Sequence, residues 1–347
     1  MSLSKKTIII SGGGTGGHIY PALAVAKELE KKGFNVIYIG SKSGLEKSIV
    51  KMEEMFLLPT TGWVGKTFIE KVLSSFRFVP GFIFSLFLVW RKKVFAIFNT
   101  GAFVSLPISI AGIFLRVPIF TLILDSKPGK AATLLSHFSK EIFLPYEGTF
   151  PLIFGKKKTI TGIPLREEIL KGNPEEALKY FSLKKGKKTL LIIGGSRGAR
   201  FLAQLAEKLI PLMGKNWQFI VQRGEFNLKI KSKLLREFPF IDRMDLAYSI
   251  SDVIIGRAGA ITIAEIEALG IPAILIPYPF AASDHQFYNA KRLASRRKNI
   301  VVIREKEVVV EDLPELIEKL YLRKEPPKEN SSAQKIAERI SNYVWKI

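Results

Sequence analysis

The chain of 347 residues contains no cysteine. Disulfides and thiolate-ligated metal sites are therefore excluded, and the absence is compatible with a reducing compartment. Acidic residues are also few, because 31 Asp and Glu stand against 53 Lys and Arg, giving a net charge of +22. Such a charge favours anionic partners, namely nucleic acid, acidic lipid headgroups or phosphorylated substrates, unless the excess lysine is only a solvated surface. No nucleic-acid-binding motif or long basic arm is present, so nucleic acid is not an expected partner.

The sequence also has little that suggests a membrane span. The longest apolar run, residues 103–124, is interrupted by two prolines, a glycine and Arg116, so no transmembrane segment is predicted. Residues 66–93 are different, because seven aromatic and six basic side chains gather there. Their apolar core, residues 78–90, is too short to cross a bilayer, but apolar bulk flanked by Lys and Arg is typical of an interfacial anchor. A buried crossover helix is the alternative. The predicted membrane patch comprises Phe82, Phe84, Phe87, Trp90, Arg91, Lys92 and Lys93.

Glycine is concentrated at two strand-to-helix turns. Five glycines lie within residues 11–18, between the apolar run 7–10 and a helical run that begins at residue 20. A second turn, residues 194–199, follows the apolar strand 187–193. Glycine permits close backbone approach, and free amides at a helix start favour negative charge. Strands alternate with helices after each turn, which predicts two doubly wound α/β domains with a cleft between them. The predicted domains are residues 1–161 with a C-terminal helix 333–347, and residues 162–332. No signal peptide is expected before the first strand.

The glycines of the first turn do not determine its ligand. Gly12, Gly14 and Gly17 match the dinucleotide fingerprint, which also requires an acid after the second strand. That strand, residues 35–40, is followed by Ser-Lys-Ser instead, and its lysine suits a 2′-phosphate, so an NADP-dependent oxidoreductase is one alternative. A P-loop is excluded because Gly17 is followed by His18.

Three further groups of polar residues follow buried strands. Thr262 and Glu265 share a helix face after Gly256; the amides there suit phosphate and Glu265 suits ribose hydroxyls, with a Thr-x-x-Glu capping box as the alternative. The segment 284–289, after the strand 273–276, is typical of sugar-hydroxyl recognition. Asp125 follows the strand 118–124, at the edge that carries the first glycine turn, and a helix cap is its alternative role.

Taken together, four motifs resemble the MurG family of peripheral membrane N-acetylglucosaminyltransferases. They are Gly13-Gly14-Thr15-Gly16-Gly17-His18-x-x-Pro21, Gly194-Gly195-Ser196-x-Gly198-Ala199, Arg257-Ala-Gly-Ala-x-Thr262-x-x-Glu265 and Asp284-His285-Gln286-x-x-Asn289. The resemblance covers about residues 7–300 and implies a GT-B fold, in which two doubly wound Rossmann-like domains face a cleft. It also implies an inverting transfer of N-acetylglucosamine from UDP-GlcNAc to undecaprenyl-diphospho-N-acetylmuramoyl-pentapeptide, converting lipid I to lipid II.

The resemblance also implies residue roles. Ile241 meets uracil, Glu265 holds the ribose, Gln286 reads the sugar, and Arg166 lies near the diphosphate. The turn Thr15–His18 faces the acceptor and the reacting centre, where His18 is the candidate base or orienting group and Asp125 a second candidate. The implied donor-binding residues are Thr15, Gly16, Gly17, Asp125, Arg166, Ser196, Ile241, Ala260, Ile261, Thr262, Glu265 and Gln286.

No metal and no cofactor are implied, since UDP-GlcNAc is a substrate. The implied partners are UDP-GlcNAc, a polyprenyl-diphosphate lipid and an anionic membrane surface. The implied location is peripheral, on the cytoplasmic face of the bacterial inner membrane, in peptidoglycan synthesis and hence cell-wall biogenesis, cell shape and division within the cell cycle.

The chain departs from the family pattern at several positions. Leu122-Ile-Leu-Asp125 replaces a usual His-Glu-Gln-Asn, Phe103 replaces a Tyr, and Ile163 replaces an Asn. These changes affect the donor contacts implied in the first domain, and they fit either a diverged enzyme or a related UDP-sugar transferase acting on another membrane lipid. A non-catalytic UDP-sugar-binding protein at the membrane is a separate alternative.

Overall fold

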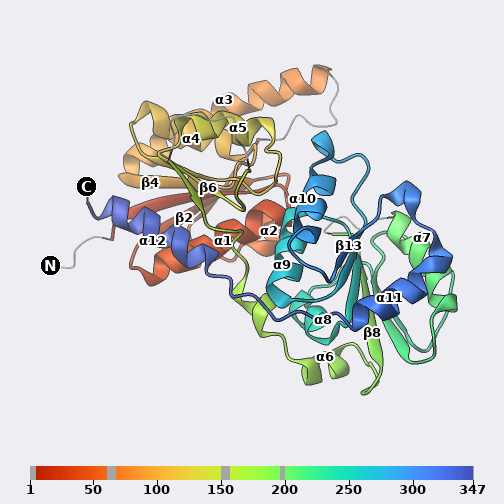
Figure 1. Cartoon of the computed structure of the whole chain (residues 1–347). Helices are drawn as coiled ribbons and strands as arrows, with labels where there is room; N and C mark the ends of the chain where they lie inside the picture. Colours follow the sequence, from red (N-terminus) through yellow and green to blue (C-terminus); the bar gives the residue numbers. More distant parts are fainter. Residues whose placement is uncertain (1–4, 61–67, 150–156, 196–199, 347) are drawn as a thin grey trace. The chain divides into compact units, whose positions relative to one another are not determined.

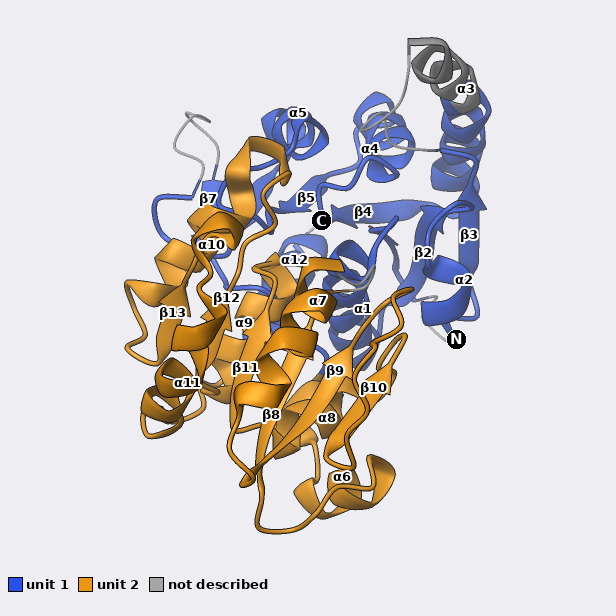
Figure 2. Cartoon of the chain, turned by 90° about the vertical axis from the view of Figure 1, so that its right-hand side faces the viewer, with its two compact units in different colours: residues 1–166, 330–347 blue, residues 167–329 orange. Residues whose placement is uncertain are grey.

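The computed structural model describes residues 5–60, 68–149, 157–195 and 200–346. The chain divides into two compact units (Figure 2): unit 1 contains Met1–Arg166 and Asn330–Ile347, and unit 2 contains Glu167–Glu329. Each unit is built on one sheet whose strands pair only in parallel among the described residues. The prediction of two doubly wound α/β domains is therefore confirmed.

Unit 1 has the strand order β3-β2-β1-β4-β5-β6-β7. Its strands are β1 (Thr7–Ser11), β2 (Asn35–Ser41), β3 (Met55–Leu58), β4 (Val94–Asn99), β5 (Ile119–Leu122), β6 (Glu141–Leu144) and β7 (Lys157–Ile160). Its helices are α1 (Gly16–Lys31), α2 (Glu46–Ile49), α3 (Phe68–Arg91), α4 (Ser105–Phe114), α5 (Lys130–Phe138) and α12 (Ser332–Val344). Helices α3, α4 and α5 lie on one face of the sheet, and α1 and α12 lie on the other (Figure 1).

The order of strands in unit 1 reverses at β1. This strand pairs with β2 on one side and with β4 on the other. Its residues Thr7-Ile-Ile-Ile-Ser11 are all buried, as expected for a parallel strand covered on both faces. The turn after β1 therefore lies at the carboxyl edge of the sheet where the winding direction changes, which is the usual ligand position of such sheets.

Unit 2 has the strand order β10-β9-β8-β11-β12-β13. Its strands are β8 (Lys188–Ile193), β9 (Trp217–Gln222), β10 (Leu235–Phe238), β11 (Val253–Gly256), β12 (Ala273–Leu275) and β13 (Ile300–Val302). Its α-helices are α6 (Pro174–Tyr180), α7 (Arg200–Leu209), α8 (Met244–Ile250), α9 (Ala260–Leu269), α10 (His285–Ala294) and α11 (Leu313–Tyr321). Short 3₁₀ turns are Glu167–Lys171, Ile210–Leu212, Ala282–Asp284, Glu305–Glu307 and Val310–Asp312.

The two faces of the second sheet carry separate cores. Along β8, Leu191 and Ile193 join residues of α8, α9 and α10, whereas Leu190 and Ile192 join residues of α7 and α11. Successive side chains of a strand point to opposite faces, so an uninterrupted apolar strand supplies both cores. Because both faces of the strands are covered, only their ends and the following turns are open to polar chemistry.

The boundaries of the units differ from the predicted boundaries at 161/162 and 332/333. The amide of Gly162 donates to the carbonyl of Leu144 at 3.3 Å, which continues the edge of β6. The side-chain amide of Asn330 donates to the carbonyl of Ile163 at 3.0 Å. These contacts hold both connecting segments to unit 1, so Arg166 belongs to unit 1 and not to the domain to which it was assigned.

The C-terminal helix α12 packs against α1 in unit 1. Ile336, Ile340 and Val344 form its buried stripe, with no exposed area. Beside this stripe, the Arg339 guanidinium donates to the buried Glu141 carboxylate at 2.9 Å. The chain thus returns to its first unit after completing the second.

Substituting Ile340 tests how much the packing of α12 stabilises unit 1. Ile340→Ala leaves a cavity under α12, so we expect the free energy of unfolding to fall by about 2–5 kcal/mol. Urea unfolding followed by circular dichroism measures the change. The control Glu338→Ala, at an exposed position of the same helix, should change the stability by less than about 0.5 kcal/mol. Equal effects of the two substitutions would show that α12 contributes no core packing.

Candidate functional site

The first glycine turn leads directly into α1, which begins at Gly16 rather than near residue 20. Thr15 is the N-cap residue but makes no side-chain cap, so the helix start carries amides of Gly16 and Gly17 with no capping side chain. Gly14 has a φ of +85°, a conformation that favours glycine. The hydroxyl of Tyr38 donates to the carbonyl of Gly12 at 2.5 Å and fixes the turn from β2.

His18 lies on the first turn of α1 and reaches the end of β4. Its Nδ1 is 3.0 Å from the carbonyl oxygen of Thr100 and 3.2 Å from the hydroxyl of that residue. A carbonyl oxygen can only accept, so Nδ1 carries the proton and the neutral ring keeps its lone pair on Nε2. The ring is thereby oriented as a hydrogen-bond acceptor or base.

Burial and a neighbouring carboxylate act on His18 in opposite directions. Burial lowers the pKa of the imidazole, and the negative charge of Asp125, beyond the end of β5, partly offsets this effect. The imidazole is therefore neutral at neutral pH. The structure brings His18 and Asp125 into one electrostatic neighbourhood at the carboxyl edge of the sheet, where β4 lies between the strands that precede them.

Arg166 lies against the helix that carries His18. Its guanidinium carbon lies 3.8 Å from the centre of the Tyr20 ring, a cation–π contact two residues from His18 in the chain. The buried Nε of Arg166 has no hydrogen-bond partner among the described residues. Tyr20 was not predicted from the sequence, although its aromatic ring on the helix that carries His18 is a recognisable partner for a cation.

In unit 2 the start of α9 lies at the corresponding edge of the sheet. The helix begins at Ala260, and its N-cap is Gly259, which has no side chain to cap the first amides. The capping-box interpretation of Thr262 and Glu265 is therefore wrong, because Thr262 is the third residue of the helix. The backbone amides of Ala260, Ile261 and Thr262 therefore lie at a helix start without a capping side chain, where free amides favour negative charge. Ser196, predicted nearby, lies outside the described residues.

Glu265 follows one turn later, and only 7% of it is exposed. The hydroxyl of Tyr248 donates to its Oε2 at 2.9 Å, so the carboxylate has a fixed orientation. Ile241 is buried in the core beneath this edge. Tyr248 was not identified from the sequence, because it lies on the preceding helix and only folding brings it to Glu265.

Gln286 and Arg257 order the turn after β12. Gln286 Oε1 accepts from the amide of Tyr278 at 3.0 Å. Arg257 donates to the carbonyls of Ile276 and Pro277 and forms an ion pair with Glu305 at 2.6 Å. A cavity of about 350 Å³ lies beside this turn and is lined by Phe201, Pro277, Pro279, Asp284, Arg304, Glu305 and Lys306.

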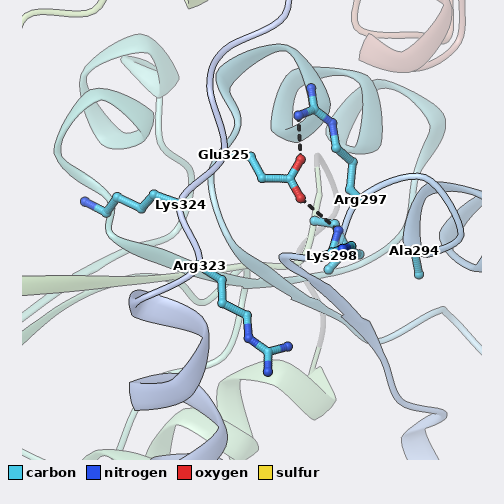
Figure 3. Close-up of a pocket in the computed structure, with 7 residues that line it drawn as sticks. Ala294, Arg297, Lys298, Arg323, Lys324 and Glu325 are labelled. Carbon is cyan, nitrogen blue, oxygen red and sulfur yellow. Dashed lines mark hydrogen bonds and ion pairs between the residues drawn. The ribbon is translucent and has the colours of Figure 1, made fainter.

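A larger cavity of about 620 Å³ lies elsewhere in unit 2 (Figure 3). Glu325 joins the Arg297 side chain at 2.6 Å and the backbone amide of Lys298 at 2.8 Å. The cavity lies at the amino end of β13, the edge opposite to the glycine turn and α9. Its ion pair connects the segment after α11 to the segment after α10, which is a structural role.

The predicted membrane patch requires a correction. Phe82 and Phe84 pack against the core of unit 1, because they lie on the inner side of α3. Phe87 and Trp90 are exposed, and with Val79 and Ile83 they form an apolar stripe along the outer side of the helix. Lys92 is paired with Glu54 at 2.9 Å, whereas Arg91 and Lys93 are exposed. No helix among the described residues is long and apolar enough to cross a membrane.

Comparison with known proteins identifies a family for both units. Residues 8–144 match the glycosyltransferase family 28 N-terminal domain, and residues 189–343 match the C-terminal domain of that family. A UDP-N-acetylglucosamine--N-acetylmuramyl-(pentapeptide) pyrophosphoryl-undecaprenol N-acetylglucosamine transferase of a Sulfurihydrogenibium species is 33% identical over 98% of this chain and 94% of its own length. The proteins of the same name from Halothermothrix orenii and Bacillus subtilis are 38% and 35% identical; these alignments cover 90% and 94% of both chains. The chain belongs to the MurG family.

Solved structures extend the comparison to the fold. The crystal structure of MurG from Acinetobacter baumannii has a TM-score of 0.72 and 24% identity, covering 97% of this chain and 99% of that one. The MnaA–UDP structure from S. aureus has a TM-score of 0.70 at 13% identity, covering 99% and 98%. The predicted GT-B fold is confirmed. Membership of the MurG family also removes the support for the oxidoreductase alternative, because both units match glycosyltransferase domains.

The electrostatics of His18 can be tested by NMR titration. Because burial disfavours the imidazolium, His18 is expected to titrate with a pKa below its ordinary value of 6.5. Asp125→Asn removes a negative charge that stabilises the imidazolium, so the pKa of His18 should fall further.

The chain contains three histidines, which makes assignment practical. His137 lies on the exposed surface of α5 and provides a reference resonance. An unchanged or raised His18 pKa in the Asp125→Asn protein would show that the carboxylate does not act on the ring.

Proposed function

We propose that this chain transfers N-acetylglucosamine from UDP-GlcNAc to undecaprenyl-diphospho-N-acetylmuramoyl-pentapeptide, the step that converts lipid I to lipid II in peptidoglycan synthesis. The observation that carries the proposal is the match of both units, over nearly the whole chain, to relatives whose names state this reaction. The first glycine turn and the start of α9 lie at the carboxyl edges of their sheets, which agrees with a two-substrate enzyme.

Unit 2 is the proposed donor-binding unit. The first amides of α9 bind the diphosphate, with the positive end of the helix dipole directed at it. Glu265, held by Tyr248, accepts hydrogen bonds from the ribose hydroxyls. Gln286 contacts the sugar from the turn after β12, and the backbone at Ile241 contacts uracil.

Unit 1 supplies the proposed base. The acceptor hydroxyl attacks the anomeric carbon of the donor, a new C–O bond forms, and the bond to UDP breaks with its electron pair leaving on the diphosphate. Nε2 of His18 takes the hydroxyl proton, because this nitrogen carries the lone pair when Nδ1 is bonded to Thr100. Attack opposite the leaving group inverts the anomeric centre. The Arg166 guanidinium, held on Tyr20, is available to offset negative charge.

The donor site is tested with Glu265→Ala. Loss of the carboxylate removes the proposed ribose acceptor and the hydrogen bond from the Tyr248 hydroxyl, so the affinity for UDP-GlcNAc should fall by about tenfold or more. Isothermal titration calorimetry measures the dissociation constant. Glu311→Ala, at an exposed glutamate of the same unit, is the control and should bind as the natural protein does. Unchanged affinity in Glu265→Ala would contradict the proposed ribose contact.

We also propose that unit 1 docks on an anionic membrane, which makes the enzyme peripheral and places it on the cytoplasmic face where its nucleotide donor is available. The docking surface consists of Val79, Ile83, Phe87, Trp90 and Phe114, with the exposed cations Arg91, Lys93 and Arg116 beside them. Trp90 and Phe114 are 69% and 71% exposed, and they come from the packed helices α3 and α4. An apolar stripe bordered by cations is typical of interfacial binding.

Charge reversal tests the docking surface. Each cation near an anionic leaflet contributes roughly 1 kcal/mol, so Arg91→Glu with Lys93→Glu should weaken vesicle binding by at least about tenfold. Sedimentation with phosphatidylglycerol-containing vesicles measures the bound fraction. Lys231→Glu with Lys233→Glu makes the same charge change at exposed positions of unit 2 and is the matched control. Equal losses in both proteins would point to net charge rather than to this surface.

A further inference from the structure

The side chain of Glu46 lies between two turns of unit 1 and is completely buried. Its Oε1 accepts from the amide of Gly14 at 3.0 Å and from the amide of Ser41 at 2.6 Å. The first amide belongs to the glycine turn after β1, and the second is the last residue of β2. One carboxylate oxygen therefore joins the carboxyl ends of two neighbouring strands.

Three glycines surround this carboxylate. A Cβ at Gly13 or Gly44 would overlap a carboxylate oxygen, and a Cβ at Gly40 would lie 2.6 Å from the Cγ of Glu46. The glycines come from the turn after β1, from β2 itself and from the segment before α2. The space that they leave is filled by the Glu46 side chain, which explains part of the glycine content of the first turn without any ligand.

The two oxygens of the Glu46 carboxylate differ in their contacts. Its Oε2 is buried and has no hydrogen-bond partner among the described residues. An unsatisfied buried oxygen lowers the stability of the folded state, so the cost at Oε2 opposes the gain from the two amide bonds at Oε1. What the carboxylate adds is a fixed acceptor for the Gly14 amide, next to the turn that leads into His18.

We propose that Glu46 is a positioning residue for the glycine turn: it holds the Gly14 amide and thereby sets the start of α1 and the place of His18. This inference rests on the proposed function for its catalytic consequence. Backbone position at the turn controls the distance from the imidazole to the acceptor hydroxyl, and small displacements of catalytic groups are costly. Glu46 acts through the turn and contacts no reacting atom.

Two substitutions separate the acceptor from the volume of the side chain. Glu46→Gln keeps a carbonyl oxygen at Oε1, whereas Glu46→Met keeps an unbranched side chain but removes the acceptor. Hydrogen exchange of the peptide spanning residues 11–18 should be faster in Glu46→Met by about tenfold or more, and close to the natural rate in Glu46→Gln. Glu53→Met, at an exposed glutamate of the same unit, is the control.

The same proteins are assayed for transfer from UDP-GlcNAc to the lipid acceptor. Glu46→Met should lose at least about tenfold in kcat/KM, with UDP affinity unchanged within about twofold, and Glu46→Gln should restore most of the rate. Equal losses in both variants, or natural exchange and activity in a folded Glu46→Met protein, would overturn the inference. If the natural protein transfers no sugar, the proposed function fails, while the exchange rates still decide the role of Glu46.

A further variant covers the case in which Glu46→Met does not fold. Gly40→Ala leaves the carboxylate in the chain but introduces a Cβ 2.6 Å from the Cγ of Glu46, and it contacts no backbone atom of the glycine turn. This variant should show the same faster exchange of residues 11–18. Natural exchange and activity in Gly40→Ala would show that the position of the carboxylate is unimportant.

Discussion

The pairing of β1 with both β2 and β4 is the constraint on which unit 1 depends. Parallel pairing brings the carboxyl ends of all strands to one edge of the sheet. The chain adds strands on one side of β1 and then on the other, and this change in winding leaves space at that edge. The amide of Thr100, just after β4, donates to the carbonyl of Ser11 at 3.1 Å. This bond joins the segment after β4 to the end of β1, so Thr100 can orient His18. The two residues are far apart in the chain and meet only because of this strand order.

The two units use the same strand–turn–helix geometry for different purposes. In unit 1 the Gly14 amide is already bonded to Glu46, and a diphosphate placed against it would also meet a buried carboxylate. In unit 2 the first turn of α9 follows Gly259 and has no capping side chain. Like charges repel strongly where water is excluded, which supports the proposal that the donor diphosphate binds unit 2. The glycine pattern of the first turn is thus a matter of packing as well as of ligand approach.

The sequence predicted the fold and the start of each glycine turn because buried strands and flanking glycines are local signals. It did not predict which residues pair across the fold. Glu46 and Tyr248 contact their partners only after the sheets form, so no local pattern marks them. The exact boundary between the units has no local signal either, because the segment after Gly162 is held by Asn330, which is distant in the chain. The sequence also did not predict which aromatic residues of α3 are buried, because apolar residues occur on both sides of that helix.

Helix α3 is apolar on both its inner and its outer side. Phe82 and Phe84 pack on the core, so the inner side alone is sufficient to hold the helix on the sheet. The exposed stripe on the outer side, with Trp90 at its end, adds nothing to that packing and leaves apolar area in contact with water. Each Å² of such area costs about 25 cal/mol relative to burial, a cost that contact with lipid would remove. This cost supports the membrane docking proposed above, in which the exposed Arg91 and Lys93 lie at the depth of the headgroups.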